Sequence, residues 1–263
     1  MLRPRIIPCL LVQNGGLVKT QIFRDPKYVG DPINAVRIFN EKEADELLVL
    51  DIDSSICGRE PDFALIAKIA AECRMPLCYG GGISTATQAL RLVDMGVEKV
   101  AVSSAAIANP SLLSQIGDAV GRQSVVVVLD VRKKTGLFTF GYEVCTRNAT
   151  VVNKVDLVAL IQQLQNIGVG EIVINSVDRD GLMCGYDLEL AIMLKQVLRV
   201  PVTFLGGAGS LKHIGLLFNK LGIVGAAAGS LFVFKGKYRA VLINYPTREE
   251  KIQLFSDTLI ALE

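Results

Sequence analysis

The sequence has little of what several kinds of site require. Its 263 residues include one histidine, His213, so a histidine-based metal site or a Ser-His-Asp triad has little material to form from. No two of the six cysteines stand at C-x-x-C spacing, and most lie in apolar segments. This pattern predicts buried free thiols rather than disulfides or a metal site.

An excess of one charge and a membrane-length apolar run are also missing. Lys and Arg number 28 against 26 for Asp and Glu, so no global basic field exists to attract nucleic acid or an anionic membrane. The uncharged apolar run Gly222–Phe234 has 13 residues, whereas a bilayer span needs about 20. With 51% apolar residues, the chain is not of a disordered type. We expect a soluble globular protein located in the cytoplasm.

Short apolar runs alternate with amphipathic segments along the whole chain. The predicted strands are Arg5–Val12, Glu46–Asp51, Pro76–Gly80, Lys99–Ser103, Ser124–Val131, Glu171–Ser176, Val202–Leu205 and Ile223–Ala227. The predicted helices are Pro32–Lys42, Asp62–Cys73, Thr85–Met95, Pro110–Val120, Asp156–Ile167, Leu188–Leu198, Leu211–Leu221 and Arg248–Leu262. Strict alternation of eight strands with eight helices, and no linker between them, predicts one (β/α)₈ TIM barrel over residues 1–263.

The first half of the sequence is repeated in the second half. The matching segments are Glu46–Asp53 with Glu171–Asp178, Met75–Gly82 with Val200–Gly207, Gly96–Ser104 with Gly222–Ser230, and Ile6–Val12 with Val125–Val131. Because the separations are nearly equal, the predicted barrel is built from two similar half-barrels.

Glycine and serine follow corresponding strands in both halves. Two predicted strands run into Gly80–Gly82 and Gly206–Gly207, and two others run into Ser103–Ser104 and Gly229–Ser230. Active sites of such barrels lie at these strand ends. Glycine lets backbone N–H groups approach an anion, and a helix start adds a positive dipole. A pair of such turns predicts an elongated bisphosphate ligand; the alternative is that the glycines only make tight turns.

Carboxylates also follow the predicted strands. Asp130 ends an otherwise apolar run, which makes it the sharpest candidate for a general acid or base. Four others, for which turn capping is an equal alternative, are Asp51, Asp53, Asp178 and Asp180. Ser176 ends another strand at the same mouth, and in the repeat alignment the partner of Asp130 is Leu11.

Two long connections could cover the mouth. The loop 13–30 contains Asn14–Lys19, and its glycines and lysine suit a lid over an anionic substrate, although a plain solvated loop is the alternative. Residues 132–149 form a second candidate cover.

Four charged residues stand at or beside strand starts on the opposite face: Arg5, Glu46, Lys99 and Glu171. Burial at the barrel bottom would require them to pair. They form either a structural salt-bridge ring or a gate on a channel through the barrel.

Several stretches together resemble a known family. They are Arg5–Leu10, Asn14–Lys19, Gly80–Ile83, Asn109–Leu112, Asp178–Gly181, Gly185–Asp187 and Gly206–Gly209. In order and at strand ends, they look like the cyclase subunit of imidazole glycerol phosphate synthase (HisF), over essentially the whole chain. That family converts phosphoribulosyl-formimino-AICAR phosphate and ammonia to imidazole glycerol phosphate and AICAR. The ammonia comes through the barrel from a HisH-like glutaminase at its N-terminal face. No cofactor is expected.

The resemblance also implies roles for individual residues. Gly82 and Ser104 match one phosphate site, while Gly181, Gly207 and Ser230 match the other. Lys19 matches the loop lysine and Asp130 the catalytic aspartate, and Ser103 stands where the family often has asparagine. The four charged residues at the strand starts match an ammonia gate. Glu98 falls where the family has an acidic residue at the glutaminase interface.

One position departs from the family. A second catalytic aspartate is expected at the end of the first strand, in a Cys-Leu-Asp-Val context, but the sequence there is Cys9-Leu10-Leu11-Val12. Leucine cannot transfer a proton, and loss of an acid–base group costs about 10²–10⁴-fold in rate. Three functions remain open. They are a working cyclase subunit, a paralogue that passes ammonia to an amidotransferase making acetamidino sugars of bacterial surface polysaccharide (lipopolysaccharide O-antigen), and a non-catalytic phosphate-binding scaffold.

Overall fold

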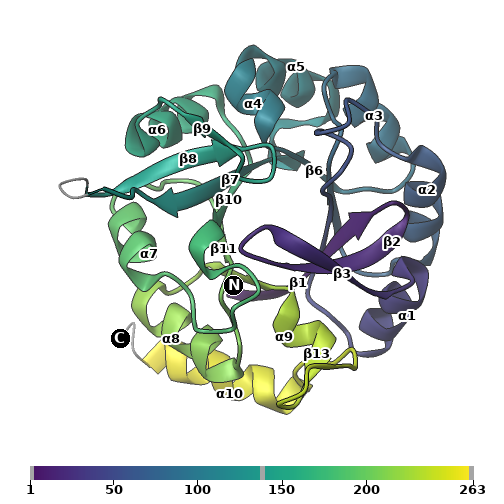
Figure 1. Cartoon of the computed structure of the whole chain (residues 1–263), viewed down its shortest axis with the longest axis vertical. Helices are drawn as coiled ribbons and strands as arrows, with labels where there is room; N and C mark the ends of the chain where they lie inside the picture. The colour runs from purple at the N-terminus through teal and green to yellow at the C-terminus, as the bar shows by residue number, and fades with distance from the viewer. Residues whose placement is uncertain (1–2, 137–139, 261–263) are drawn as a thin grey trace.

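Eight parallel strands close into a barrel in the computed structural model, which describes residues 3–136 and 140–260 (Figure 1). They are β1 (Arg5–Gln13), β4 (Leu47–Asp51), β5 (Leu77–Gly80), β6 (Lys99–Val102), β7 (Val125–Lys133), β10 (Glu171–Ser176), β11 (Val202–Leu205) and β12 (Gly225–Ala228). The chain order is kept around the barrel, and parallel pairing of β12 with β1 and of β7 with β10 joins the two halves. The predicted TIM barrel is therefore confirmed.

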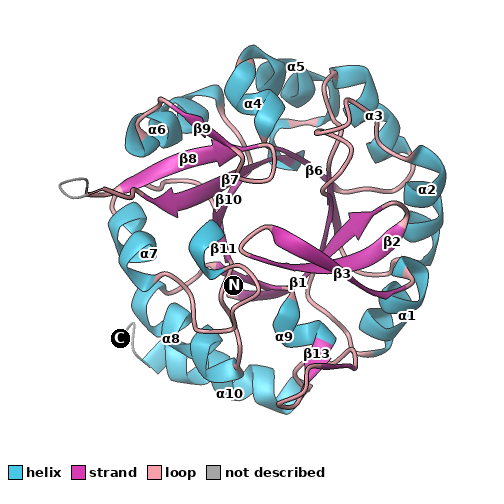
Figure 2. Ribbon diagram, in the orientation of Figure 1, coloured by secondary structure: helices cyan, strands magenta, loops and turns pink. Residues whose placement is uncertain are grey.

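The helices between the strands form the outer ring (Figure 2). They are α1 (Pro32–Glu41), α2 (Phe63–Glu72), α3 (Ala86–Asp94), α5 (Ser111–Val120), α6 (Leu157–Ile167), α7 (Leu188–Lys195), α8 (Leu211–Leu221) and α10 (Arg248–Ile260). Several begin where the sequence supplies a capping side chain: Asp31 accepts from the backbone N–H of Asn34, and Thr85 forms a capping box with Gln88. Such caps satisfy the first free N–H groups of a helix.

Two apolar cores follow from the alternation of side chains along each strand. Outward residues such as Ile6 and Leu47 pack against the helices. Inward residues fill the barrel itself: Ile7, Cys9, Leu48, Cys78, Ala101, Val126, Val128, Val173, Leu205 and Ala227. Burial on both faces explains why the strands read as continuous apolar runs.

The predicted loop 13–30 is wrong in one respect, because it folds as an antiparallel hairpin. β2 (Gly16–Gln21) pairs with β1 and with β3 (Arg24–Gly30), so the first barrel strand continues into the hairpin. The hairpin lies across the barrel opening (Figure 1). Its turn contains Ile22 and Phe23, both at positive φ, a conformation that bulky residues rarely adopt.

Other short elements also escaped prediction from the sequence. β8 (Tyr142–Thr146) and β9 (Val151–Asn153) extend β7 over the second predicted cover, of which residues 137–139 lie outside the described residues. α4 (Ser104–Ala108) and α9 (Ser230–Val233) follow β6 and β12, and the remaining pieces are η1 (Arg122–Ser124), η2 (Val177–Arg179), β13 (Phe234–Lys235) and β14 (Ala240–Val241). The last two residues of the predicted helix 248–262 are likewise outside the described part.

Predicted and observed boundaries differ mostly by one or two residues. The largest shift among the helices is at α7, which ends at Lys195 instead of at residue 198. Within residues 3–136 and 140–260, none of the helices combines the length and the hydropathy that a membrane crossing requires.

Candidate active site

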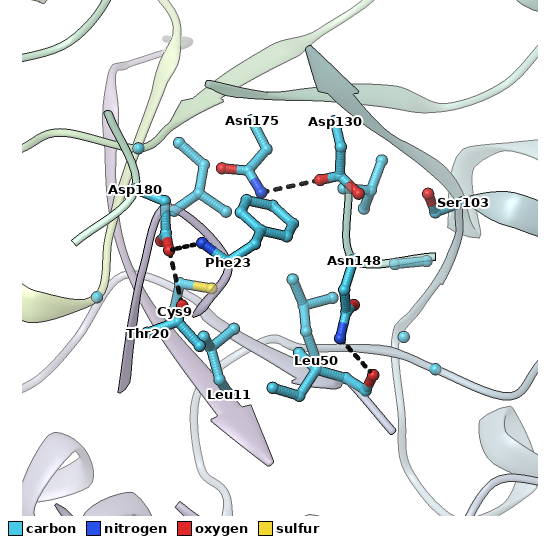
Figure 3. Close-up of a pocket in the computed structure, with 18 of the residues that line it drawn as sticks. Cys9, Leu11, Thr20, Phe23, Leu50, Ser103, Asp130, Asn148, Asn175 and Asp180 are labelled. Atoms are coloured by element: carbon cyan, nitrogen blue, oxygen red, sulfur yellow. Dashed lines mark hydrogen bonds between the residues drawn. The ribbon is translucent and has the colours of Figure 1, made fainter. Parts of the chain in front are cut away.

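One cavity opens at the carboxyl ends of the barrel strands (Figure 3). It brings together eleven of the residues predicted for the mouth: Lys19, Asp51, Gly82, Ser103, Ser104, Asp130, Asp180, Gly181, Gly207, Gly229 and Ser230. Ser176 was also predicted at the mouth, but this prediction is wrong for the cavity, because Ser176 does not line it. Side chains alternate along β10, so Asn175 faces the cavity and its neighbour turns away.

The glycine turns leave no room for side chains. Gly82 and Gly207 both have positive φ. A Cβ on Gly82 would lie 2.7 Å from the backbone oxygen of Arg59, and one on Gly207 would lie 2.1 Å from that of Gly185. A larger residue at either position would move the backbone that lines the cavity. Both turns can therefore present bare backbone to a ligand.

Lys19 reaches the cavity from the hairpin strand β2. Its side chain is buried, and its Nζ donates to the backbone oxygen of Cys9 over 2.6 Å. Burial lowers the pKa of this lysine. A Cβ on Gly229 would lie 2.5 Å from the Nζ, so the amine sits directly against the turn after β12. Lys19 is thus held inside the mouth by strand β2 of the hairpin.

Asp130 is buried at the inner wall of the cavity. The Nδ2 of Asn175 donates to its Oδ1 over 2.9 Å (Figure 3), and the two residues are partners in the parallel register of β7 and β10. Burial raises the pKa of Asp130 to about 7, with the hydrogen bond from Asn175 opposing the rise and the charge of Asp180 adding to it. A carboxyl with this pKa can give or take a proton near neutral pH.

The other acidic candidates are engaged in holding the mouth together. Asp180 accepts from the Thr20 hydroxyl over 2.7 Å and from the backbone N–H of Phe23, which fixes the hairpin. Asp51 accepts from the Ser54 hydroxyl and from two backbone N–H groups of its own turn. Asp53 accepts from the Gln13 amide over 2.9 Å.

Asp178 also has a structural contact. It accepts from the backbone N–H of Lys133 over 2.7 Å and does not line the cavity, and neither does Asp53. The capping interpretation therefore fits Asp51, Asp53 and Asp178 better than an acid–base role does.

Leu11 lines the cavity on the side opposite the Asp130 carboxyl. It pairs in register with Leu50 of β4, and both leucines pack against the inner core. Figure 3 shows Leu11 and Leu50 on one side of the cavity, with Asn175 and Asp130 on the other. The two leucines therefore present hydrocarbon across the cavity from the polar pair.

The four charged residues predicted at the strand starts form a closed ring at the other end of the barrel. Arg5 pairs with Glu46 and, over 2.7 Å, with Glu171, while the Lys99 Nζ lies 2.7 Å from Glu46 and 2.9 Å from Glu171. The Thr203 hydroxyl donates to Glu171 over 2.6 Å. Burial alone would raise the pKa of Glu171, but the hydrogen bond and charge of Arg5, aided by Lys99 and Thr203, lower it to about 2. Glu171 is thus ionised and paired at neutral pH, and Glu46 contacts the same two cations.

The cysteine prediction holds only in part. All six thiols are free, but Cys57 and Cys184 are exposed. Both stand in loops at the mouth side rather than in strands or helices. No group of three or more His, Cys, Asp or Glu side chains that could hold a metal occurs in residues 3–136 and 140–260.

Two lining residues near the carboxyls were among those not singled out from the sequence. Phe23 enters the cavity from the hairpin turn, and Asn175 reaches it from β10. Asn175 could have been found, because every second residue of a strand faces the same side. Glu171 of the same strand was already expected inside the barrel, so Val173 and Asn175 should face inward as well. No signal marked Phe23, since the hairpin itself was not predicted.

Comparison with known proteins decides the family. A family model described as "Histidine biosynthesis protein" matches residues 5–239. A protein of Vibrio vulnificus named "Putative imidazole glycerol phosphate synthase subunit hisF3" is 56% identical over 95% of this chain and 96% of its own length. The chain belongs to the HisF family. A second HisF-family protein, of Pseudomonas aeruginosa and named as a hisF2 subunit with the same qualifier, is 51% identical over 94% of this chain and 97% of its own.

Four proteins named without that qualifier share less of their sequence with this HisF-family chain, at 37–38% identity. The imidazole glycerol phosphate synthase subunit HisF of Aliivibrio fischeri is 38% identical over 88% of this chain and 91% of its own. The family relation and the barrel are thus secure. Sequence identity is lower to the proteins named HisF without a qualifier than to those whose names carry "Putative".

The raised pKa of Asp130 predicts a pH-dependent stability. The folded state holds the proton more tightly than the unfolded chain, whose pKa is 3.8. The stabilisation is therefore complete below about pH 4 and is lost as the pH rises through about 7. From pH 5 to pH 8 we expect the native protein to lose about 2–3 kcal/mol of unfolding free energy that Asp130→Asn does not lose. Urea unfolding of both proteins at the two pH values measures this; parallel pH profiles would contradict it.

Proposed function

We propose that this HisF-family chain is the ammonia-using synthase subunit of a glutamine amidotransferase. One observation carries the proposal: a charged ring closes one end of the barrel, a cavity with a buried carboxyl opens at the other, and an apolar interior joins them. Ammonia is small and uncharged, so an apolar interior suits its passage better than that of an ion. A HisH-like glutaminase would deliver it at the face where Glu98 is exposed.

The ligand at the mouth would be an elongated bisphosphate. Gly82 and the start of α4 at Ser104 would hold one phosphate, and Gly181, Gly207 and Ser230 would hold the other. Lys19 lies buried against Gly229, next to Ser230, where its amine can contact a phosphate. The substrate that fits this arrangement is phosphoribulosyl-formimino-AICAR phosphate, from which ammonia attack gives imidazole glycerol phosphate and AICAR.

Asp130 would carry the proton transfers. At neutral pH its carboxyl is divided between the protonated and the ionised form, because its pKa is about 7. It can donate a proton to a leaving nitrogen and accept one in a later step. Leu11 on the opposite wall can do neither, so one residue would have to serve both steps.

Leu11 also favours a second candidate function. If the cyclase steps are lost, the same ring, interior and phosphate turns would pass ammonia to a separate sugar amidotransferase, as in acetamidino-sugar formation for surface polysaccharide. The hydrocarbon wall at Leu11 and Leu50 is the observation that supports it.

Ammonium-dependent turnover tests the proposal. The purified chain is assayed with phosphoribulosyl-formimino-AICAR phosphate and high ammonium at alkaline pH, which removes the need for the glutaminase. Turnover that disappears in Asp130→Asn is expected for a synthase subunit. Tight binding of the bisphosphate without turnover would favour the ammonia-passing function, and absence of both binding and turnover would overturn both.

A further inference from the structure

A buried oxygen in the mouth has no hydrogen-bond partner. Asn175 is 6% exposed, and its Nδ2 donates to Asp130. Its Oδ1 is buried and meets no donor among the residues that the structure describes. An unpaired buried carbonyl costs about 1–3 kcal/mol. A water molecule or a ligand can supply the missing donor at such a position.

Asn175 stands at the upper end of the barrel interior. The inward residues of β10 are Glu171 in the charged ring, Val173 in the inner core, and then Asn175 at the cavity. Four residues of a strand span about 13 Å. On the neighbouring strand, Val128 of the inner core is likewise followed by Asp130. A molecule that travels up the apolar interior therefore meets this polar pair where the lining ends.

The pair offers two acceptors and is suited to a particular small donor. The amide N–H of Asn175 occupies Oδ1 of Asp130, which leaves the second carboxylate oxygen to accept. Ammonia has three N–H bonds and one lone pair. If two of its N–H bonds are held by oxygens on the inner wall, the lone pair is directed away from the wall and toward a ligand in the cavity. On the opposite side, Leu11 and Leu50 present hydrocarbon, and the amide N–H of the neighbouring Asn148 already donates to the backbone oxygen of Ile52.

Resting on the proposed function, we propose that Asn175 and Asp130 form the site that receives ammonia at the mouth, with the Asn175 Oδ1 accepting one of its N–H bonds. Asn175 is then a positioning residue for the nucleophile and not a ligand of the bisphosphate. This role predicts a selective effect on ammonium, since nothing in it touches the phosphate turns.

A matched pair of variants tests this role. Asn175→Thr keeps an oxygen that can accept a hydrogen bond, whereas Asn175→Val has the same shape without one. Valine loses both the acceptor for ammonia and the donor to Asp130, whereas a threonine hydroxyl can supply both. We therefore expect the valine variant to raise the KM for ammonium about tenfold or more, since even one lost hydrogen bond of about 1.4 kcal/mol gives about tenfold. The threonine variant should stay within about threefold of the native value. The KM for the bisphosphate should change little in either.

An effect on the KM for the bisphosphate instead of on the KM for ammonium would overturn the proposal. If both variants change the KM for the bisphosphate and leave that for ammonium unchanged, Asn175 binds the larger ligand instead. Equal effects of threonine and valine on the KM for ammonium would show that packing, and not the oxygen, matters at this position.

A second measurement does not depend on turnover. With ¹³Cγ-labelled asparagine, the Asn175 resonance is assigned by its loss in Asn175→Thr and is followed while ammonium chloride is added at alkaline pH. Tetramethylammonium chloride at equal ionic strength is the control, because it has no N–H bond. A saturable shift with ammonium alone is expected even if the chain fails to turn over the bisphosphate. No such shift would overturn the ammonia site whatever the activity.

Discussion

Replacing Leu11 by aspartate is expected to raise ammonium-dependent turnover of phosphoribulosyl-formimino-AICAR phosphate by about 10²-fold or more. The side chain lines the cavity on the wall opposite Asp130, so the new carboxyl would supply the second acid–base group that the native chain lacks. With two carboxyls, one can accept a proton while the other donates. The initial rate of AICAR formation, measured at saturating ammonium, reports the gain.

Leu11→Asn is the matched control for this prediction. Asparagine has nearly the same shape and polarity as aspartate but does not titrate near neutral pH. An equal gain in both variants would attribute the effect to polarity or to a looser wall. A native chain that is already fast, and that aspartate does not improve, would mean that Asp130 alone carries both proton transfers.

Removing Glu171 is expected to lower the free energy of unfolding by about 3 kcal/mol, toward the lower end of what breaking a buried pair costs. Glu171→Ala leaves Arg5 and Lys99 sharing Glu46 alone and takes the acceptor from the Thr203 hydroxyl. The two cations are partly exposed, with side-chain accessibilities of 26% and 22%, so water moderates the loss. Urea unfolding at pH 7 gives the value.

Acidification should narrow the difference in unfolding free energy between the native protein and Glu171→Ala. The pKa of Glu171 is about 2 in the folded protein and 4.5 in the unfolded chain. Its stabilisation is therefore present above about pH 4.5 and is lost as the pH falls toward 2. Glu189→Ala is the control, because this carboxylate pairs with Lys133 at the surface and its loss should leave unfolding unchanged within error. An equal effect of both variants would refute a special role for the ring.

The barrel could be predicted because burial on both faces leaves a strong pattern. Val125–Leu129 and Ile172–Ile174 have no polar residue, and only a strand covered on both sides tolerates that. The hairpin had no such pattern. Its second strand, Arg24–Gly30, is mostly exposed and carries proline and charge, so its pairing depends on β2 and on the contact between Phe23 and Asp180. Contacts of that kind join segments distant in sequence and leave no local signal.

The site was predictable to the extent that strand ends reveal it. Glycine and serine after β5, β6, β11 and β12 marked the cavity correctly, because their position follows from the barrel alone. Turn capping was one of the two alternatives for Asp51, and its contacts with its own turn fit that alternative. The partner of Asp180 could not be predicted, because it comes from the hairpin. Nor could the strand ends give the pairing of Asn175 with Asp130, which depends on the register between β7 and β10.

The charged ring has a consequence for the ancestry of the two halves. The first half supplies Arg5, Glu46 and Lys99, and the second supplies Glu171 alone. In the repeat, Glu46 corresponds to Glu171, but Arg5 and Lys99 correspond to Ser124 and Gly225. Two copies of the first half would bring four cations to two carboxylates, and two copies of the second would bring two carboxylates without a cation. After their duplication the halves have become complementary in charge, so neither can replace the other in a symmetric barrel.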